Sequence, residues 1–394
     1  MSNSLLILGR QPALGLAELE SLYGTDAVQP ASSEAALLDV ESGEVDFTRL
    51  GGSVKLCKVL DTFDTTRWPD IQKSLERLAP RVTADMPEGK ILLGISAYGL
   101  DIRPQQLVAA GLTIKKALRT NGRSVRLVPN QEPALNSAQV LHNKLTAENG
   151  CELVIVRNGG KTICARTVAE QDIESYTLRD RGRPKRDARV GMLPPKLAQI
   201  IINLAVGSDR PDSQIILDPF CGTGVVLQEA MLMGYTPYGT DLEPRMIEYS
   251  HANLNWLREH FNFGLAPGRL EQGDATTYQW DNIVQFVAGE TYLGRPFTSQ
   301  PNAEVLAQTT SDVNVILTKF LSNIGSQLPT GARLCLAVPA WQIAPDKFKH
   351  LPLIDRLSDL GYNRVRFEHV RDEQLLDYRE DQIVARELLV LTRK

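Results

Sequence analysis

Hydrophobic residues follow two different spacings in the first half of the chain. Short apolar runs typical of strands occupy Leu5–Leu8, Lys90–Ser96, Ser124–Val128, Cys151–Arg157 and Lys161–Thr167. Elsewhere apolar residues recur every three or four positions, as on one face of a helix, in Leu14–Tyr23, Pro104–Arg119 and Ser137–Leu145. The strand-like runs Cys151–Arg157 and Lys161–Thr167 flank Asn-Gly-Gly at 158–160, which favours a hairpin. The pattern predicts an α+β fold for this half.

After residue 190 the same two spacings alternate regularly. The strands expected there are Gln214–Leu217, Thr236–Thr240, Ile283–Val287 and Arg333–Val338, and the helices are Pro194–Val206, Val225–Met233 and Pro244–Phe261. Such alternation is typical of a mostly parallel sheet covered by helices. Two further runs, Arg364–Val370 and Ile383–Leu391, are expected to close the sheet as an antiparallel pair.

The segment 176–191 separates the two patterns. Its sequence, YTLRDRGRPKRDARVG, is basic and poor in apolar residues, which is typical of a linker. We therefore expect a small N-terminal α+β region over 1–80, a second α+β domain over 81–175, a basic linker over 176–191 and an α/β domain over 192–394. A chain of 394 residues is long enough for two to three domains.

Charge is distributed unevenly along the chain. The formal net charge is -4, but residues 1–100 carry -5, residues 101–190 carry +7 and residues 191–394 carry -6. A basic middle region is typical of a nucleic-acid footprint, although chance clustering on a solvated surface gives the same pattern. If the region binds RNA, the contacts are expected from Arg179, Arg183, Lys185 and Arg186.

The number and spacing of the cysteines and histidines argue against disulfide-rich and metal-binding proteins. The five cysteines are odd in number and lack CxxC spacing, and the five histidines are scattered, so neither a disulfide framework nor a metal site is expected. The N-terminus lacks the features of a signal peptide, and no apolar run approaches the length needed to span a bilayer. We expect a protein of the reducing cytoplasm with no membrane partner.

The segment Leu217–Gly224, LDPFCGTG, joins an expected strand to an expected helix. Gly222 and Gly224 allow a tight turn and close approach of a ligand to the helix N-terminus. The third glycine of a dinucleotide fingerprint and the Gly-Lys-Ser/Thr of a P-loop are both missing. The loop therefore predicts a nucleoside-like ligand without a phosphate contact.

Two further acidic residues follow later strands. Asp241 ends the next expected strand, where a carboxylate can accept hydrogen bonds from ribose hydroxyls. Asp274 follows the next helix and is a candidate acceptor for an adenine amine. Each alone is also explained as a helix cap. Together with Asp218, the ordered set favours an adenosyl ligand with a positive centre.

These motifs resemble those of class I methyltransferases, and in particular RNA-guanosine methyltransferases with an N-terminal THUMP domain. The resemblance implies a Rossmann-like, mostly parallel sheet with an antiparallel C-terminal hairpin, a THUMP-like RNA-binding domain over 81–175, and S-adenosylmethionine as cofactor. It rests on DPFCGTGVVLQEAMLMG and YGTDLEPRMIEYSHANL, with GMLPPKLA at 191–198 resembling the junction that covers the cofactor. The implied cofactor residues are Pro194, Asp218, Pro219, Cys221, Gly222, Gly224, Asp241, Leu242, Asp274 and Ala275.

One motif of that family is altered. Methyltransferases of this family that act on amines carry Asn/Asp-Pro-Pro-Tyr/Phe after the fourth strand, whereas this chain has VAGETYLGRP at 287–296. Glu290 is the candidate acceptor for the target amine and Tyr292 the candidate stacking face, although their spacing is one residue shorter than in the motif. The alternative is that both residues only terminate a strand.

The resemblance implies an RNA methyltransferase that acts on a guanosine exocyclic amine, with tRNA as the expected substrate. Two alternatives stay open. One is a methyltransferase of DNA or ribosomal-RNA bases, and the other is an RNA-binding protein that holds the cofactor without turnover.

Overall fold

The computed structural model describes all residues except 1–2, 188–191, 209–213, 262–267, 281–283 and 298. The chain forms two compact units. The first consists of Met1–Leu16, Thr25–Thr48 and Gly52–Ile173, and the second of Ala17–Gly24, Arg49–Gly51 and Glu174–Lys394. The main boundary lies close to the one expected at 175, whereas the boundary expected at 80 falls inside the first unit.

The first unit is built on one eight-stranded sheet with the order β2-β3-β1-β4-β8-β7-β5-β6. The long strand β4 pairs with β1 on one side and β8 on the other, so regions before and after residue 80 share the sheet. The expected hairpin is present as β7 and β8. The strands are β1 (Ser4–Leu8), β2 (Val28–Ser32), β3 (Ala35–Leu38), β4 (Ser53–Phe63), β5 (Lys90–Tyr98), β6 (Ser124–Leu127), β7 (Gly150–Asn158) and β8 (Lys161–Glu170).

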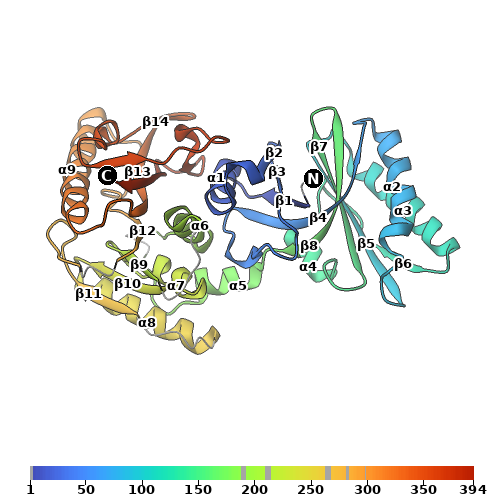
Figure 1. The fold of residues 1–394 in the computed structure, drawn as a ribbon, viewed down its shortest axis with the longest axis horizontal. Helices are drawn as coiled ribbons and strands as arrows, with labels where there is room; N and C mark the ends of the chain where they lie inside the picture. Colours follow the sequence, from blue (N-terminus) through green and yellow to red (C-terminus); the bar gives the residue numbers. More distant parts are fainter. Residues whose placement is uncertain (1–2, 188–191, 209–213, 262–267, 281–283, 298) are drawn as a thin grey trace. The chain divides into compact units, whose positions relative to one another are not determined.

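Two helices, α2 (Trp68–Val82) and α3 (Pro104–Thr120), lie together beside β5 and β6 in this unit (Figure 1). Their apolar faces pack on alternate residues of β5 and β7, such as Leu93 and Leu153, in one cluster of buried side chains. The periodicity of α3 predicted its position, while α2 was not anticipated. The short helix α4 (Ser137–His142) ends three residues before the expected Leu145.

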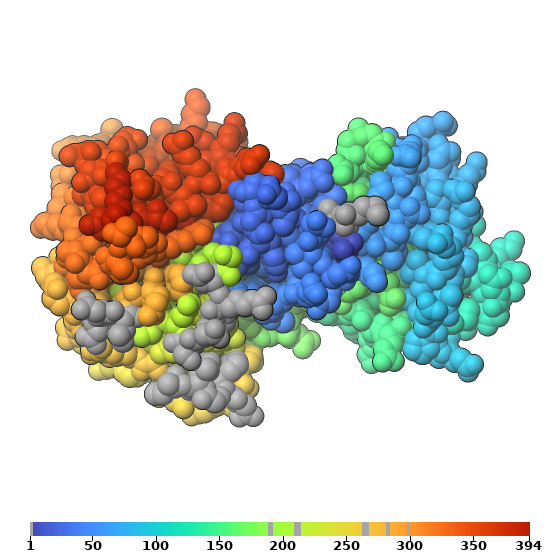
Figure 2. Space-filling view, in the orientation of Figure 1, coloured from blue at the N-terminus to red at the C-terminus, as the bar shows by residue number. Residues whose placement is uncertain are grey.

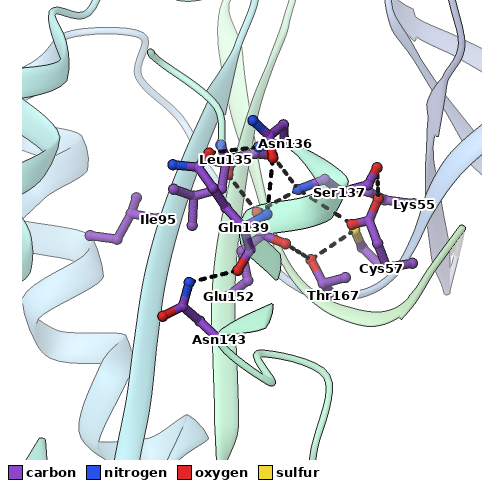
Figure 3. A network of polar contacts seen from close by, with 12 residues as sticks. Lys55, Cys57, Ile95, Leu135, Asn136, Ser137, Gln139, Asn143, Glu152 and Thr167 are labelled. Atoms are coloured by element: carbon purple, nitrogen blue, oxygen red, sulfur yellow. Dashed lines mark hydrogen bonds and ion pairs between the residues drawn. The ribbon is translucent and has the colours of Figure 1, made fainter. Parts of the chain in front are cut away.

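A buried ionic network lies on the other face of β4, β7 and β8. Lys55 donates to Glu152 over 2.6 Å and lies 3.6 Å from Glu170, and all three side chains are at least 98% buried. Figure 3 shows Glu152 also meeting Thr167, whose hydroxyl donates to it. A charged residue at a buried strand position explains why the hydrophobic pattern did not reveal β4.

The second unit has a nine-stranded sheet whose main order is β11-β10-β9-β12-β13-β17-β15. The first five strands are parallel, and β17 runs antiparallel between β13 and β15. The expected antiparallel closure is therefore confirmed, although its strand ends at Arg364 and not at Val370. The strands are β9 (Ile215–Asp218), β10 (Thr236–Asp241), β11 (Arg269–Gln272), β12 (Phe286–Glu290), β13 (Arg333–Ala344), β14 (Lys347–Lys349), β15 (Tyr362–Arg364), β16 (Leu376–Asp377) and β17 (Val384–Arg393).

Helices cover both faces of this sheet. In Figure 1, α9 (Ala303–Gly325) and α6 (Pro195–Val206) lie on opposite sides of β12 and β13, and α9 buries Phe320 and Ile324 against Leu334 and Leu336. The helices α7 (Val225–Leu232) and α8 (Pro244–Phe261) cover β9 to β11. The orange and red residues after β12 and the yellow residues of α8 occupy separate parts of the surface of this unit (Figure 2).

Much of the expected linker is ordered structure. It includes the end of α5 (Ile173–Thr177) and a π-helix over Leu178–Gly182, while 188–191 lies outside the described residues. The second unit also contains the end of α1 (Pro12–Tyr23). There Asn203 of α6 donates to Glu18 over 2.7 Å and to the backbone carbonyl of Arg49 over 2.8 Å. None of the described helices has the length and apolar character of a membrane span.

Candidate active site

The acidic and glycine residues singled out in the sequence meet at one edge of the second sheet. The strand order reverses between β9 and β12, and the carboxyl ends of parallel strands beside such a switch form a crevice where ligands bind. Asp218 ends β9, Asp241 ends β10 and Glu290 ends β12. A β-carbon on Gly289 would lie only 2.5 Å from Asp218 Oδ1, so the ends of β9 and β12 are in close contact.

The glycine loop has the backbone that its sequence requires. Gly222 has a φ of 51° and Gly224 a φ of 80°, in the left-handed region that glycine adopts most easily. The Gly222 amide donates to Asp241 Oδ2 over 2.8 Å, and the Cys221 amide donates to the Thr240 carbonyl over 3.0 Å. The loop is therefore fixed to the end of β10 before any ligand arrives.

Two residues of α8 hold the other side of this loop. Ser250 Oγ donates to the Gly222 carbonyl over 2.9 Å, and Asn253 Nδ2 donates to the Thr223 carbonyl over 2.8 Å. Both side chains are fully buried and lie three residues apart, so they share one face of α8. Neither residue was predicted from the sequence as part of the site, although two polar residues beside the apolar stripe of α8 indicate a buried polar contact.

Burial determines the properties of Asp218 and Cys221. Asp218 is 2% exposed and accepts a hydrogen bond from the Phe220 amide, and burial, with smaller contributions from Asp241 and Glu290, raises its pKa. Burial likewise raises the pKa of the Cys221 thiol, which packs with Leu227 in an apolar cluster. The neighbouring Pro219 is also buried. Cys221 is accordingly a packing residue and not a nucleophile.

The predicted nucleoside-binding residues differ in their exposure and in the hydrogen bonds that they already make. Asp241 accepts backbone hydrogen bonds on both carboxylate oxygens, and the next residue, Leu242, has 61% of its surface exposed. Asp274 is exposed, and its Oδ1 caps the turn at Thr276, while Ala275 is buried. The turn explains Asp274 without a ligand. Pro194, before α6, is partly exposed.

Glu290 is held from two strands away. Arg386 of β17 donates to Glu290 Oε1, and the side chains of Glu290 and Arg386 are 14% and 9% exposed. Burial raises the pKa of Glu290, and the Arg386 charge and hydrogen bond oppose that rise. Tyr292 is 46% exposed and lines a cavity of about 540 Å³ together with Arg295 and residues of α9. The structure thus places a carboxylate near an open aromatic face.

The predicted RNA-binding residues fall into two groups. Lys185 and Arg186 are exposed, whereas Arg179 and Arg183 are 7% and 3% exposed. Arg179 donates to the buried Glu229 over 2.7 Å, which explains why it faces the interior. The expectation that Arg179 and Arg183 contact RNA therefore needs correction, because neither guanidinium faces solvent.

Comparison with known proteins identifies the fold. Residues 183–262 match a family model described as an RMKL-like methyltransferase domain. The solved structure of TrmN from Thermus thermophilus aligns with a TM-score of 0.52 at 17% identity and covers 99% of both chains. A possible methylase from Clostridium difficile aligns with a TM-score of 0.54 at 11% identity over 100% of this chain and 98% of that one. The second unit has a Rossmann-like methyltransferase fold.

A curated relative supports the sequence resemblance. The tRNA (guanine(10)-N2)-dimethyltransferase of Methanothermobacter thermautotrophicus is 32% identical over 150 residues, or 38% of this chain. The match covers 39% of the relative, so the chain aligns with about two fifths of its length. The resemblance to methyltransferases that modify guanosine in tRNA is thereby confirmed.

Proposed function

We propose that the protein is an S-adenosylmethionine-dependent RNA methyltransferase that acts on a guanosine exocyclic amine, with tRNA as its substrate. The observation that carries the proposal is the joining of the glycine loop, Asp241 and Glu290 at one edge of a methyltransferase-fold sheet. The curated relative, named for the same modification, supports the choice of atom and RNA.

The residues of the crevice fit the proposed cofactor. Gly222 leaves the loop backbone open, because a β-carbon there would meet only the Phe220 carbonyl oxygen at 3.9 Å. Asp241 can accept from ribose hydroxyls through its remaining lone pairs, and Leu242 offers an exposed apolar side chain for the adenine. Asp218 ends β9 at the same edge of the sheet and would be a further carboxyl group for the cofactor. When bound, S-adenosylmethionine supplies an electrophilic methyl group on a sulfonium sulfur.

Glu290 and Tyr292 suit the methyl acceptor. An exocyclic amine is a poor nucleophile while its lone pair is delocalised into the ring, and a carboxylate that accepts an amine hydrogen favours the reactive geometry. In the proposed reaction, Glu290 would orient the amine nitrogen toward the methyl group that the bound cofactor would supply, and Glu290 or water would take up the amine proton. Tyr292 can stack on the extruded base, for which the adjoining cavity has room.

Several features support the substrate class and compartment that we propose. The exposed Lys185 and Arg186 precede the methyltransferase core, and cations of this kind bind phosphates. We propose that the first unit, as a THUMP-like domain, adds further RNA contacts. All five cysteines are buried and none forms a disulfide, which is consistent with a protein of the reducing cytoplasm.

The direct test is methyl transfer from labelled S-adenosylmethionine to unmodified tRNA, ribosomal RNA and DNA. We expect label in tRNA, recovered as N2-methylated guanosine after digestion to nucleosides, and about 100-fold less product from a Glu290→Gln variant. Label in ribosomal RNA or DNA alone would establish the alternative substrate classes. Cofactor binding by calorimetry with no label in any nucleic acid would instead establish a binding protein without turnover.

A further inference from the structure

The carboxylate of Glu290 is part of a row of charges that crosses three strands. Glu290 is in register with Ala337 of β13, and Pro339, two residues further on, is in register with Arg386 of β17. Residues two apart on a strand share a face, so Glu290 and Arg386 lie on the same face with β13 between them. The small Ala337 leaves room for the long arginine side chain to reach across.

A second carboxylate lies on the far side of the guanidinium. Asp377 of β16 is in register with Arg386, and its Oδ2 is 4.0 Å from Arg386 Nη1. Asp218 of β9 lies against Gly289 at the end of β12, and the Glu290 charge adds to the rise in the pKa of Asp218. Arg386 thus lies between the carboxyl groups of Glu290 and Asp377, and all three side chains are mostly buried.

Only one carboxylate oxygen of Glu290 accepts a hydrogen bond from the residues of this row. Oε1 accepts from Arg386, and Oε2 accepts no hydrogen bond from any residue that the structure describes. A carboxylate held in this way has a fixed orientation and one acceptor left for a ligand. This chain lacks the Pro-Pro motif that holds the amine acceptor in the related methyltransferases. The ion pair with Arg386 provides instead a rigid, oriented acceptor at the end of the fourth parallel strand.

We propose that Arg386 is a positioning residue that keeps Glu290 ionised and directs its second oxygen toward the target amine. The inference rests on the proposed function, since it assigns a role to Glu290 in methyl transfer. Without the guanidinium, Glu290 would lose the cation that it binds, while Asp377 would still oppose its negative charge. The carboxyl group would then take up a proton at neutral pH and present a donor or a rotated oxygen to the amine.

The test compares the pH dependence of single-turnover methyl transfer in wild type and Arg386→Gln. Loss of the cation raises the pKa of Glu290, so the acid limb of the profile should move to higher pH by at least about one unit. The rate at pH 7 should fall by about tenfold or more and recover in part at pH 9. Arg386→Lys keeps the charge and should leave the acid limb near its wild-type position.

A second readout does not depend on turnover. Infrared difference spectra of the cofactor-free protein should show a protonated carboxyl band at pH 7 in Arg386→Gln that is missing from the Arg386→Gln/Glu290→Gln double variant. Arg364→Gln is the matched control, because Arg364 lies 3.3 Å from Glu387 in the same sheet but does not contact Glu290. It should lose comparable stability and keep the wild-type pH profile.

The outcomes separate this inference from the proposed function. A wild-type pH profile in Arg386→Gln, with no protonated carboxyl band, would overturn the role of Arg386. Full activity in Glu290→Gln would overturn the role of Glu290 in the proposed reaction, while the infrared band would still report whether Arg386 controls its ionisation.

Discussion

Asp241 combines two tasks in one side chain. It anchors the glycine loop through the Gly222 amide and holds the start of α8 through the Glu243 amide. The same carboxylate is the expected acceptor for ribose hydroxyls. Preorganisation by the first two contacts lowers the entropic cost of the third, because the acceptor is already fixed before the ligand binds.

Asp241→Ala should therefore weaken S-adenosylmethionine binding by at least about tenfold, since each hydrogen bond to a charged group contributes roughly 1.5–3 kcal/mol. Isothermal titration calorimetry measures the affinity, and a melting curve shows whether the variant is folded. Asp274→Ala is the comparison, because the turn at Thr276 explains Asp274 without a ligand. Equal affinity of a folded Asp241→Ala protein and wild type would refute the ribose contact.

Individual site residues differed in how well the sequence predicted them. Gly222, Gly224 and Asp241 belong to compact motifs whose spacing reflects a strand, a turn and a helix, so local rules locate them. Arg386 lies 96 residues from Glu290 and meets it only because β17 inserts antiparallel beside β13. No local pattern encodes that pairing. The burial of Arg179 was not predicted for a related reason, because its partner Glu229 lies on a later helix.

At the scale of elements, periodicity identified those that bury one apolar face. It predicted α3, α6 and α8 with ends within about three residues, as expected for helix boundaries. The longest helix, α9, was missed, although Val313, Phe320 and Ile324 have helical spacing. Its many Thr, Val and Asn residues have low helix propensity, and packing against the sheet overrides that preference.

The network around Lys55 gives the first unit a predictable pH response. Burial raises the pKa of Glu170 to about 7, with Lys55 opposing the rise. An unfolded glutamate titrates near 4.5. Between these values the folded state holds a proton that the unfolded state has released, so stability falls as pH rises through that window.

Glu170→Gln should flatten this part of the stability curve between pH 5 and 8, because the amide does not titrate. Urea unfolding across that range measures the effect. Glu152→Gln is the contrasting variant: it removes the carboxylate that binds Lys55 over 2.6 Å and should cost about 3–5 kcal/mol at every pH in the range. A Glu170→Gln curve parallel to wild type would show that Glu170 stays ionised in the folded state.

At the scale of the whole molecule, sequence patterns separated two fold types but not the borders between them. The second unit includes the end of α1 and residues 49–51, because Asn203 binds both Glu18 and the Arg49 carbonyl. Contacts across more than 150 positions leave no trace in local spacing. The strands before and after residue 80 likewise join one sheet only through the pairing of β4 with β8.

Charge distribution is the whole-molecule property that bears on the proposed RNA substrate. The net charge of -4 disfavours general attraction to a polyanion, so binding has to rely on local cations such as those of 101–190. Within the ordered segment before the core, Arg181, Lys185 and Arg186 are exposed, while Arg179 pairs with Glu229 in the interior. The exposed three are therefore the ones to test.

Replacing Arg181, Lys185 and Arg186 by Glu should weaken tRNA binding and leave S-adenosylmethionine affinity unchanged. Phosphate contacts release condensed cations, so the logarithm of the wild-type association constant should fall linearly with the logarithm of salt concentration, and the variant slope should be smaller by about 2–3. Reversal of Lys319, Arg356 and Arg366, exposed residues of the second unit that have no proposed RNA contact, changes the charge equally and is the matched control. Filter binding between roughly 50 and 300 mM salt measures both slopes. A salt-independent wild-type affinity would contradict phosphate recognition, and an equal loss in the control would assign the effect to net charge and not to the segment before the core.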